Sequence, residues 1–148
     1  MKILAALSAL ALLPAFGFAQ NPTSEGTLPE TQAANEEKLK KVQAATIAAL
    51  EASLWDPDTD SRQAAIYALE AMGPGAKPAM ASLAQRMRDP DAYLRADAAR
   101  TLVEIGPDAI PFMLPLLQDC DPRVRQLTGW ALAEINFNVA SGKPTGLH

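Results

Sequence analysis

The sequence contains very few of the side chains that usually carry chemistry. Its 148 residues include one histidine, His148, and one cysteine, Cys120. A nucleophile assisted by histidine, or a metal site built on several histidines, therefore has no basis in this chain. Aromatic residues make up only 5% of the sequence, so a folded core has to be built from Ala, Leu, Ile and Met.

Positive charge is also scarce. The formal net charge is −4, and the sequence has no extended run of Lys and Arg. An acidic surface repels the phosphate backbone, so we predict no nucleic-acid partner. Cys120 falls at the place of the apolar Met87 in the repeat described below, and we predict it to be buried and inert rather than paired.

The N-terminus has the features of an export signal. Residues 1–19 carry one positive charge, a short apolar run and Pro14, and they end in small side chains. Gly17 and Ala19 suit a signal-peptidase site, so we predict cleavage before Gln20, a periplasmic or extracellular location and no membrane span afterwards. The polar residues 20–34, which contain Pro and Gly, are predicted to form a flexible linker.

The remainder is organised by an internal repeat. Asp56-Pro57 recurs 33 residues later as Asp89-Pro90, and Gly73-Pro74 recurs as Gly106-Pro107. Apolar side chains between these marks follow a helical period. A repeat of this length made of two helices indicates an all-α, right-handed α-solenoid of stacked antiparallel helix pairs.

The repeat sets the predicted domain boundaries. The folded domain covers residues 35–136, and residues 137–148 form an irregular tail. Leu39, Val42, Ile47, Leu50 and Leu54 share one face of the first helix, which resembles the second helix of a truncated repeat. The predicted segments of the domain are a cap helix 35–55, a repeat 56–88, a repeat 89–118 and a partial repeat 119–136.

These residues resemble the HEAT-repeat family, in particular the short bacterial repeats related to phycobilin-lyase repeats. The shared pattern is D-P-x(4)-R-x-x-A-x(3)-L-x-x-[IM]-G-P followed by a proline-led helix, and it covers about residues 40–135. The resemblance implies a ladder of aspartates and arginines between repeats, with Asp89 beside Arg95 and Asp56 beside Arg62. Its predicted members are Asp56, Arg62, Asp89, Arg95, Asp119 and Arg125.

The same resemblance places the second helices on a concave surface that holds another protein. Projected onto that surface, the candidate binding residues are Ser82, Gln85, Arg86 and Gln118. Trp130 is a further candidate, because the partial repeat has no second helix and the flank with Leu127, Ala131 and Glu134 lacks a cover.

No catalytic, cofactor or metal-binding residue is predicted. HEAT-like iron hydroxylases depend on His-Glu pairs, which this sequence does not contain. The stretch beginning at Asp56 has the D-x-D-x-D opening of a calcium loop, but Ser61 and Tyr67 stand where the loop needs Gly and Glu.

Three functional hypotheses follow. The first is an exported scaffold or protein-interaction module without catalytic activity. The alternative is an accessory or enzyme-related member of the phycobilin-lyase or HEAT-like hydroxylase families, which would need a cleft with converging polar groups. The third is a structural protein that associates with copies of itself through the C-terminal flank.

Overall fold

The computed structural model describes residues 29–143. The chain divides into two units, Met1–Glu36 and Glu37–His148, and the described part of the first unit is the beginning of one helix. The predicted signal peptide, the start at Gln20 and most of the predicted linker therefore lie outside the described residues. So does the end of the chain from residue 144.

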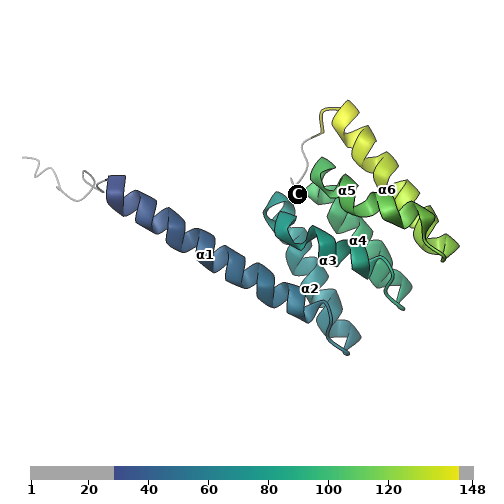
Figure 1. Cartoon of the computed structure of the whole chain (residues 1–148), viewed down its shortest axis with the longest axis horizontal. Coiled ribbons are helices and arrows are strands. Elements are labelled where there is room, and N and C mark those ends of the chain that lie inside the picture. The colour runs from purple at the N-terminus through teal and green to yellow at the C-terminus, as the bar shows by residue number, and fades with distance from the viewer. Residues whose placement is uncertain (1–28, 144–148) are drawn as a thin grey trace, which may run out of the picture. The chain divides into compact units, whose positions relative to one another are not determined.

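Every described element is a helix, which confirms the predicted all-α fold of stacked helix pairs (Figure 1). The leading helix and the first pair are α1 (Pro29–Ser53), α2 (Thr59–Met72), η1 (Gly73–Ala79) and α3 (Met80–Arg86). The second pair and the last helix are α4 (Ala92–Ile105), η2 (Pro107–Ala109), α5 (Ile110–Met113), η3 (Leu114–Gln118) and α6 (Pro122–Ala140).

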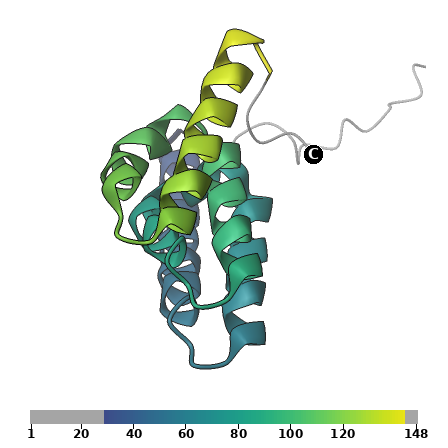
Figure 2. The ribbon, with the colours of Figure 1, turned by 90° about the vertical axis from the view of Figure 1, so that its right-hand side faces the viewer.

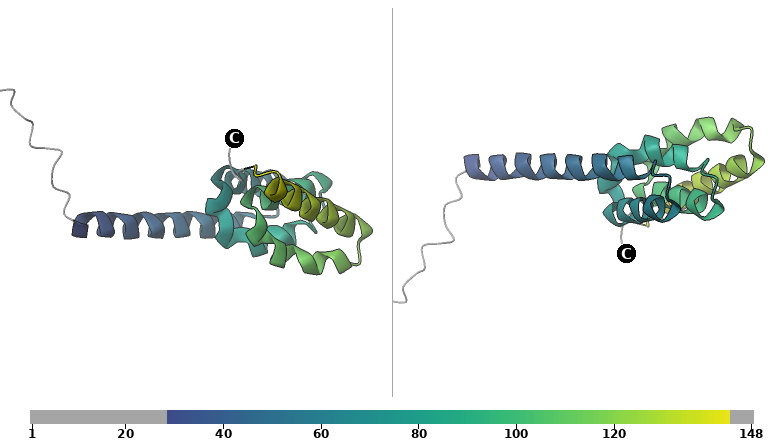
Figure 3. Two further views of the ribbon diagram at one scale, coloured as in Figure 1. Left: turned by 90° about the horizontal axis from the view of Figure 1, so that it is seen from above. Right: turned by 90° about the horizontal axis from the view of Figure 1, so that it is seen from below.

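The first helices of the repeats form one row. α2 packs against α4, and α4 packs against α6. The second helices form the other layer (Figures 2 and 3). This layer packs against the first row, because α3 contacts α4 and η3 contacts α6. In Figure 2 the chain turns back from η3 into α6 through a short loop.

Glycine and proline end the first helices of the two full repeats. Gly73 has φ 50° and Gly106 has φ 98°, a conformation that costs glycine little. The prolines that follow cannot continue an α-helix without losing a hydrogen bond. The first helix of each pair therefore stops at the predicted place, and a 3-10 segment leads into the second.

The third repeat differs, and here the predicted boundary was wrong. Asn136 stands at the place of Gly73 and Gly106, and α6 continues through it to Ala140. Asn costs less than Gly inside a helix, and Phe137 rather than proline follows it. The segment 137–140 is therefore helical and not part of an irregular tail.

Two further predictions need correction. α1 begins at Pro29 and not at Asn35, because proline suits a first helical turn and Glu30 follows it there. Residues 32–46 of this helix are exposed, including Leu39 and Val42, which were expected on its packed face. The packed face of α1 thus begins at Ile47.

The core is built from the repeating apolar positions. Its fully buried side chains include Leu54, Leu69, Leu83, Leu102 and Ile135. Leu54 lies in the turn after α1 and the other four come from α2, α3, α4 and α6, so one continuous core joins all the repeats. Burying one side chain of this size contributes roughly 1.5–3 kcal/mol.

Candidate functional site

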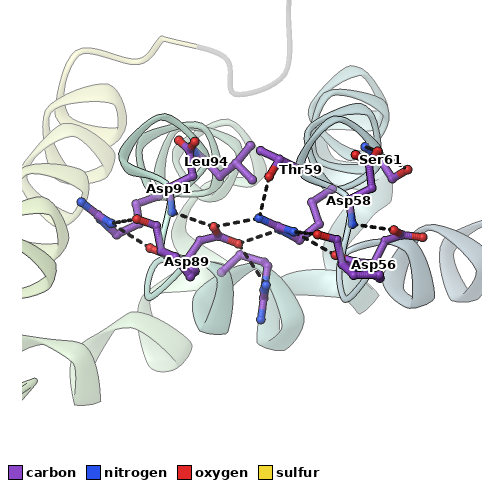
Figure 4. Close-up of polar contacts among 12 residues, drawn as sticks. Asp56, Asp58, Thr59, Ser61, Asp89, Asp91 and Leu94 are labelled. Carbon is purple, nitrogen blue, oxygen red and sulfur yellow. Dashed lines mark hydrogen bonds and ion pairs between the residues drawn. The ribbon is translucent and has the colours of Figure 1, made fainter.

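Each repeat opens with the same turn. The carboxylates of Asp56, Asp89 and Asp119 each accept a hydrogen bond from the backbone N–H two residues later, at 2.8–2.9 Å. That residue is the N-cap of the next helix: Asp58, Asp91 or Asp121. Figure 4 shows the first two of these turns side by side. The two aspartates of each turn therefore supply acceptors for backbone donors that the helix start leaves free.

An arginine six residues after the first aspartate completes each turn. Arg62 Nη1 donates to the carbonyls of Asp56 and Pro57 at 2.9 and 3.0 Å. Arg95 makes the equivalent bonds within its own turn, as does Arg125. The predicted neighbours Asp89 and Arg95 are thus joined through a backbone carbonyl, and the same holds for Asp56 and Arg62.

The carboxylate of Asp89 joins the first two repeats. Its side chain has no exposed surface, and it accepts bonds from Arg62 Nε and Arg86 Nη1, both at 3.0 Å (Figure 4). Arg62 therefore reaches across to the next repeat. The guanidinium of Arg86 also lies over the ring of Trp55, 3.8 Å from its centroid, a cation–π contact. Arg86 is consequently held within the fold and is not a free binding residue.

The second junction uses a different arginine. The carboxylate of Asp119 pairs with Arg88, which precedes the turn, and not with Arg95. Asp89 lies six residues after Leu83, whereas Asp119 lies three residues after the equivalent Leu116. The shorter connection changes which cation reaches the carboxylate. An aspartate–arginine pair thus joins the repeats at both junctions, but the predicted partner Arg95 bonds to the backbone of its own turn and to neither carboxylate.

The ionisation of these turns follows from their hydrogen bonds. The N–H of Asp121 and the guanidinium of Arg88 hold the pKa of Asp119 below its ordinary value. The N–H and hydroxyl of Ser61 lower the pKa of Asp58 in the same way. Hydrogen bonds that favour the charged carboxylate have this effect. Both groups therefore favour the folded chain at neutral pH.

A ligand-binding reading of the acidic turns has no support among residues 29–143. No group of three or more His, Cys, Asp or Glu side chains there could hold a metal ion. The carboxylates of Asp56 and Asp58 accept bonds from the backbone of their own turn. The D-x-D-x-D stretch thus caps a helix.

The predicted binding residues of the second helices separate into two groups. Ser82 donates to Glu51 of α1 at 2.7 Å, and Arg86 belongs to the Asp89 cluster. Gln85 lines an open groove between α3 and the second helix of the next repeat, and Gln118 is exposed at the end of η3. Gln85 and Gln118 remain available for contacts.

The groove has a volume of about 290 Å³ and is mainly apolar. Its lining includes Ala81, Gln85, Arg88, Pro111, Phe112 and Pro115. Arg88 is its charged lining residue, and its charge is balanced by Asp119. A cleft for a small substrate usually has several converging polar groups, whereas the polar side chains lining this groove are Gln85 and Arg88. This groove instead suits one or two apolar side chains of another chain.

Sequence reasoning missed the apolar residues around this groove. Phe112, Leu114 and Leu117 are about half exposed. The available signal was Pro115, at which the α-helix gives way to the 3-10 winding of η3. A 3-10 helix has 3.0 residues per turn. Side chains whose faces were predicted from the 3.6 residues per turn of an α-helix therefore fall on different faces.

The C-terminal predictions were partly wrong as well. Trp130 is 48% exposed, as an available contact residue must be. Ala131 is fully buried and Leu127 is half-buried, so their side of α6 is covered. Cys120 is exposed, and its expected burial is incorrect because the shorter connection before α6 moves it out of the core.

Within the described range, no helix is both long and apolar enough to cross a membrane. A family model described as HEAT repeats matches residues 80–144, from α3 onward. None of the curated proteins matches the chain. HEAT repeats typically mediate protein interactions, so the matched segment is a helical module of that kind. The matched residues and the paired helices are therefore similar to HEAT repeats.

Proposed function

We propose that this protein is an exported scaffold that binds another protein through the groove between α3 and the following repeat. The observation that carries the proposal is the half-exposed Phe112 at the groove, beside Pro115 and the available Gln85. Exposed apolar surface of this kind, bordered by polar side chains, is typical of protein contact sites. The partner would insert an aliphatic or aromatic side chain beside Phe112.

We also propose that the protein has no catalytic activity of its own. The sequence supports this through its single histidine, His148, and its single cysteine. The groove supports it too, because its one charged lining residue is already paired with Asp119. The proposal of export rests on the sequence of residues 1–19 alone.

The exposed flank of α6 is proposed as a second contact surface. Trp130 and Phe137 are 48% and 64% exposed there, on a helix that ends the row of first helices. This surface is distinct from the groove, so the two can be tested separately.

The groove is tested by affinity capture from the producing cells, using the wild type and Phe112→Arg as baits. The matched control is Tyr93→Arg, because Tyr93 is 79% exposed on α4 and does not line the groove. We expect a protein that is enriched by the wild type and the control but lost with Phe112→Arg. Equal enrichment by all three baits would show that the groove is not the binding surface.

A further inference from the structure

The two ends of the helix stack expose surfaces that the internal repeats bury. Positions in α2, α4 and α6 correspond through shifts of 33 and then 30 residues. Ile66 and its equivalent Ala99 are fully buried by the following repeat, but the third equivalent, Gly129, is exposed. Val103 is buried in α4, and its equivalent Ala133 is exposed in α6. We call the surface formed by Gly129, Leu132, Ala133 and Asn136 the tail face.

The opposite end of the row shows the same relation. Thr101 of α4 and Ala131 of α6 are fully buried against the preceding repeat, whereas the equivalent Ala68 of α2 is only half-buried. Tyr67, which corresponds to Arg100 and Trp130, is 46% exposed. We call the surface formed by Ala64, Tyr67, Ala68 and Ala71 the head face.

The residues that define the two end faces are uncharged, and the charged equivalents of Arg62 and Asp89 at the two ends are Arg125 and Asp56. At the internal junction of α2 and α4, the corresponding positions hold Glu70 and Arg100, whose carboxylate and guanidinium are 2.9 Å apart. At the junction of α4 and α6 they hold Val103 and Trp130. The end faces hold Ala133 and Tyr67, a small and an aromatic side chain that can replace those pairs without burying a charge.

The order of the helices supplies a second, independent argument. Ile47 and Leu50 of α1 and Leu54 just after it occupy the places of Met80, Leu83 and Met87, so the stack begins on a helix of the second type. It ends in α6, a helix of the first type. Adding one copy to the tail of another therefore brings α1 to the place after α6 where the residues up to 143 hold no second helix.

The side of α1 that would meet α6 is also uncharged. Val42, Thr46, Ala49 and Ser53 follow one another at helical spacing. The hydroxyls of Thr46 and Ser53 donate to the carbonyls of Val42 and Ala49 in the same helix. Their polar groups are thereby satisfied, and the stripe presents mainly carbon atoms.

We infer that the partner of the tail face is the head face of a second copy of this chain, so that copies stack head to tail. This inference rests on the proposed role of the α6 flank as a contact surface and does not involve the groove. Because the two faces are different, the association is heterologous and does not close at two copies.

The area predicts weak association. Tyr67 is the one large aromatic side chain of the two faces, so together with Leu132 and the surrounding alanines it removes roughly a few hundred Å² from water. That is at the low end of specific interfaces, for which we expect dissociation constants of about 10–100 µM.

The test introduces one charge into each face, singly and together, and measures association by sedimentation over a range of concentrations. Tyr67→Arg and Ala133→Glu each place one unpaired charge in the junction, and each should weaken association at least tenfold. The double variant Tyr67→Arg/Ala133→Glu reproduces the pairing of Arg100 with Glu70 and should recover it. Both substitutions introduce residues that the chain already carries at equivalent positions, so we expect the fold to be kept, as circular dichroism will check.

Mixing the two single variants gives a sharper result. Each keeps one intact end, so the introduced charges pair at one junction and the two intact ends meet at the next; a 1:1 mixture should therefore recover the association that each variant alone has lost. A wild type that stays monomeric up to about 1 mM would overturn the inference. So would a chain sensitive to Ala133→Glu but not to Tyr67→Arg, because that pattern means two tail faces meet around a two-fold axis. Loss of capture with Phe112→Arg concerns the groove alone, so failure of either proposal is recognised separately.

Discussion

Removing Arg62 tests the physical account of how the repeats are joined. Arg62 is 9% exposed, and its guanidinium donates to the buried carboxylate of Asp89 and to the carbonyls of Asp56 and Pro57. Breaking a buried ion pair usually costs 3–5 kcal/mol, because a charge remains buried without its partner. Asp89 keeps its bond from Arg86, so we expect Arg62→Ala to lower the free energy of unfolding by about 3 kcal/mol.

The assay is equilibrium unfolding in urea, with thermal melting as a second measurement. A loss of this size should lower the melting temperature by roughly 10–20 °C in a domain of this length. Arg100→Ala is the matched control, since Arg100 pairs with Glu70 and Asp97 but is 47% exposed, and it should cost less than about 1 kcal/mol. Arg95→Ala, which loses two bonds to carbonyls, should fall between them. Equal losses for Arg62 and Arg100 would refute the role assigned to Asp89.

Three other predictions concern pH, processing and metals. The pKa of Asp119 lies below its ordinary value of 3.8, so its contribution to stability is full above that pH and is lost as the pH falls through the folded pKa. Asp119→Asn should therefore flatten the fall in melting temperature as the pH drops below about 4, and an unchanged slope there would contradict this. Intact-mass measurement of the protein from the producing cells should give a chain beginning at Gln20, and a retained Met1 would disprove export by this route. Calcium or a chelator should leave the melting temperature unchanged, whereas a rise of several degrees with calcium would indicate a site at Asp56.

Local chemistry was sufficient to predict the architecture. Gly73-Pro74 and Gly106-Pro107 stop a helix wherever they occur, because glycine accepts a positive φ and proline lacks a donor. These Gly-Pro pairs recur along the chain, and apolar side chains follow a helical spacing between them. The two features together predicted the paired helices and most of the core. Neither effect depends on contacts between distant residues, so both can be read from the chain alone.

The pairing of charges across repeats was decided by tertiary structure. The sequence placed Asp89 and Arg95 in one turn, but whether an arginine reaches a carboxylate depends on how far one repeat is displaced from the next. The connection before Asp119 is three residues shorter than the one before Asp89, and this brings Arg88 to the second carboxylate. A motif of fixed spacing does not contain that displacement.

The exposure of individual side chains was likewise decided by how the helices pack in three dimensions. Cys120 and Leu117 occupy places that are apolar in the repeat, yet both are exposed, because the 3-10 winding after Met113 and the short connection turn them outward. Ala99 and Gly129 occupy equivalent places in their helices, and only the presence of a following repeat buries the first. The sequence by itself determined that these helices would form and stack; which of their faces are left open was determined by the three-dimensional arrangement, because burial depends on neighbours supplied by distant parts of the chain.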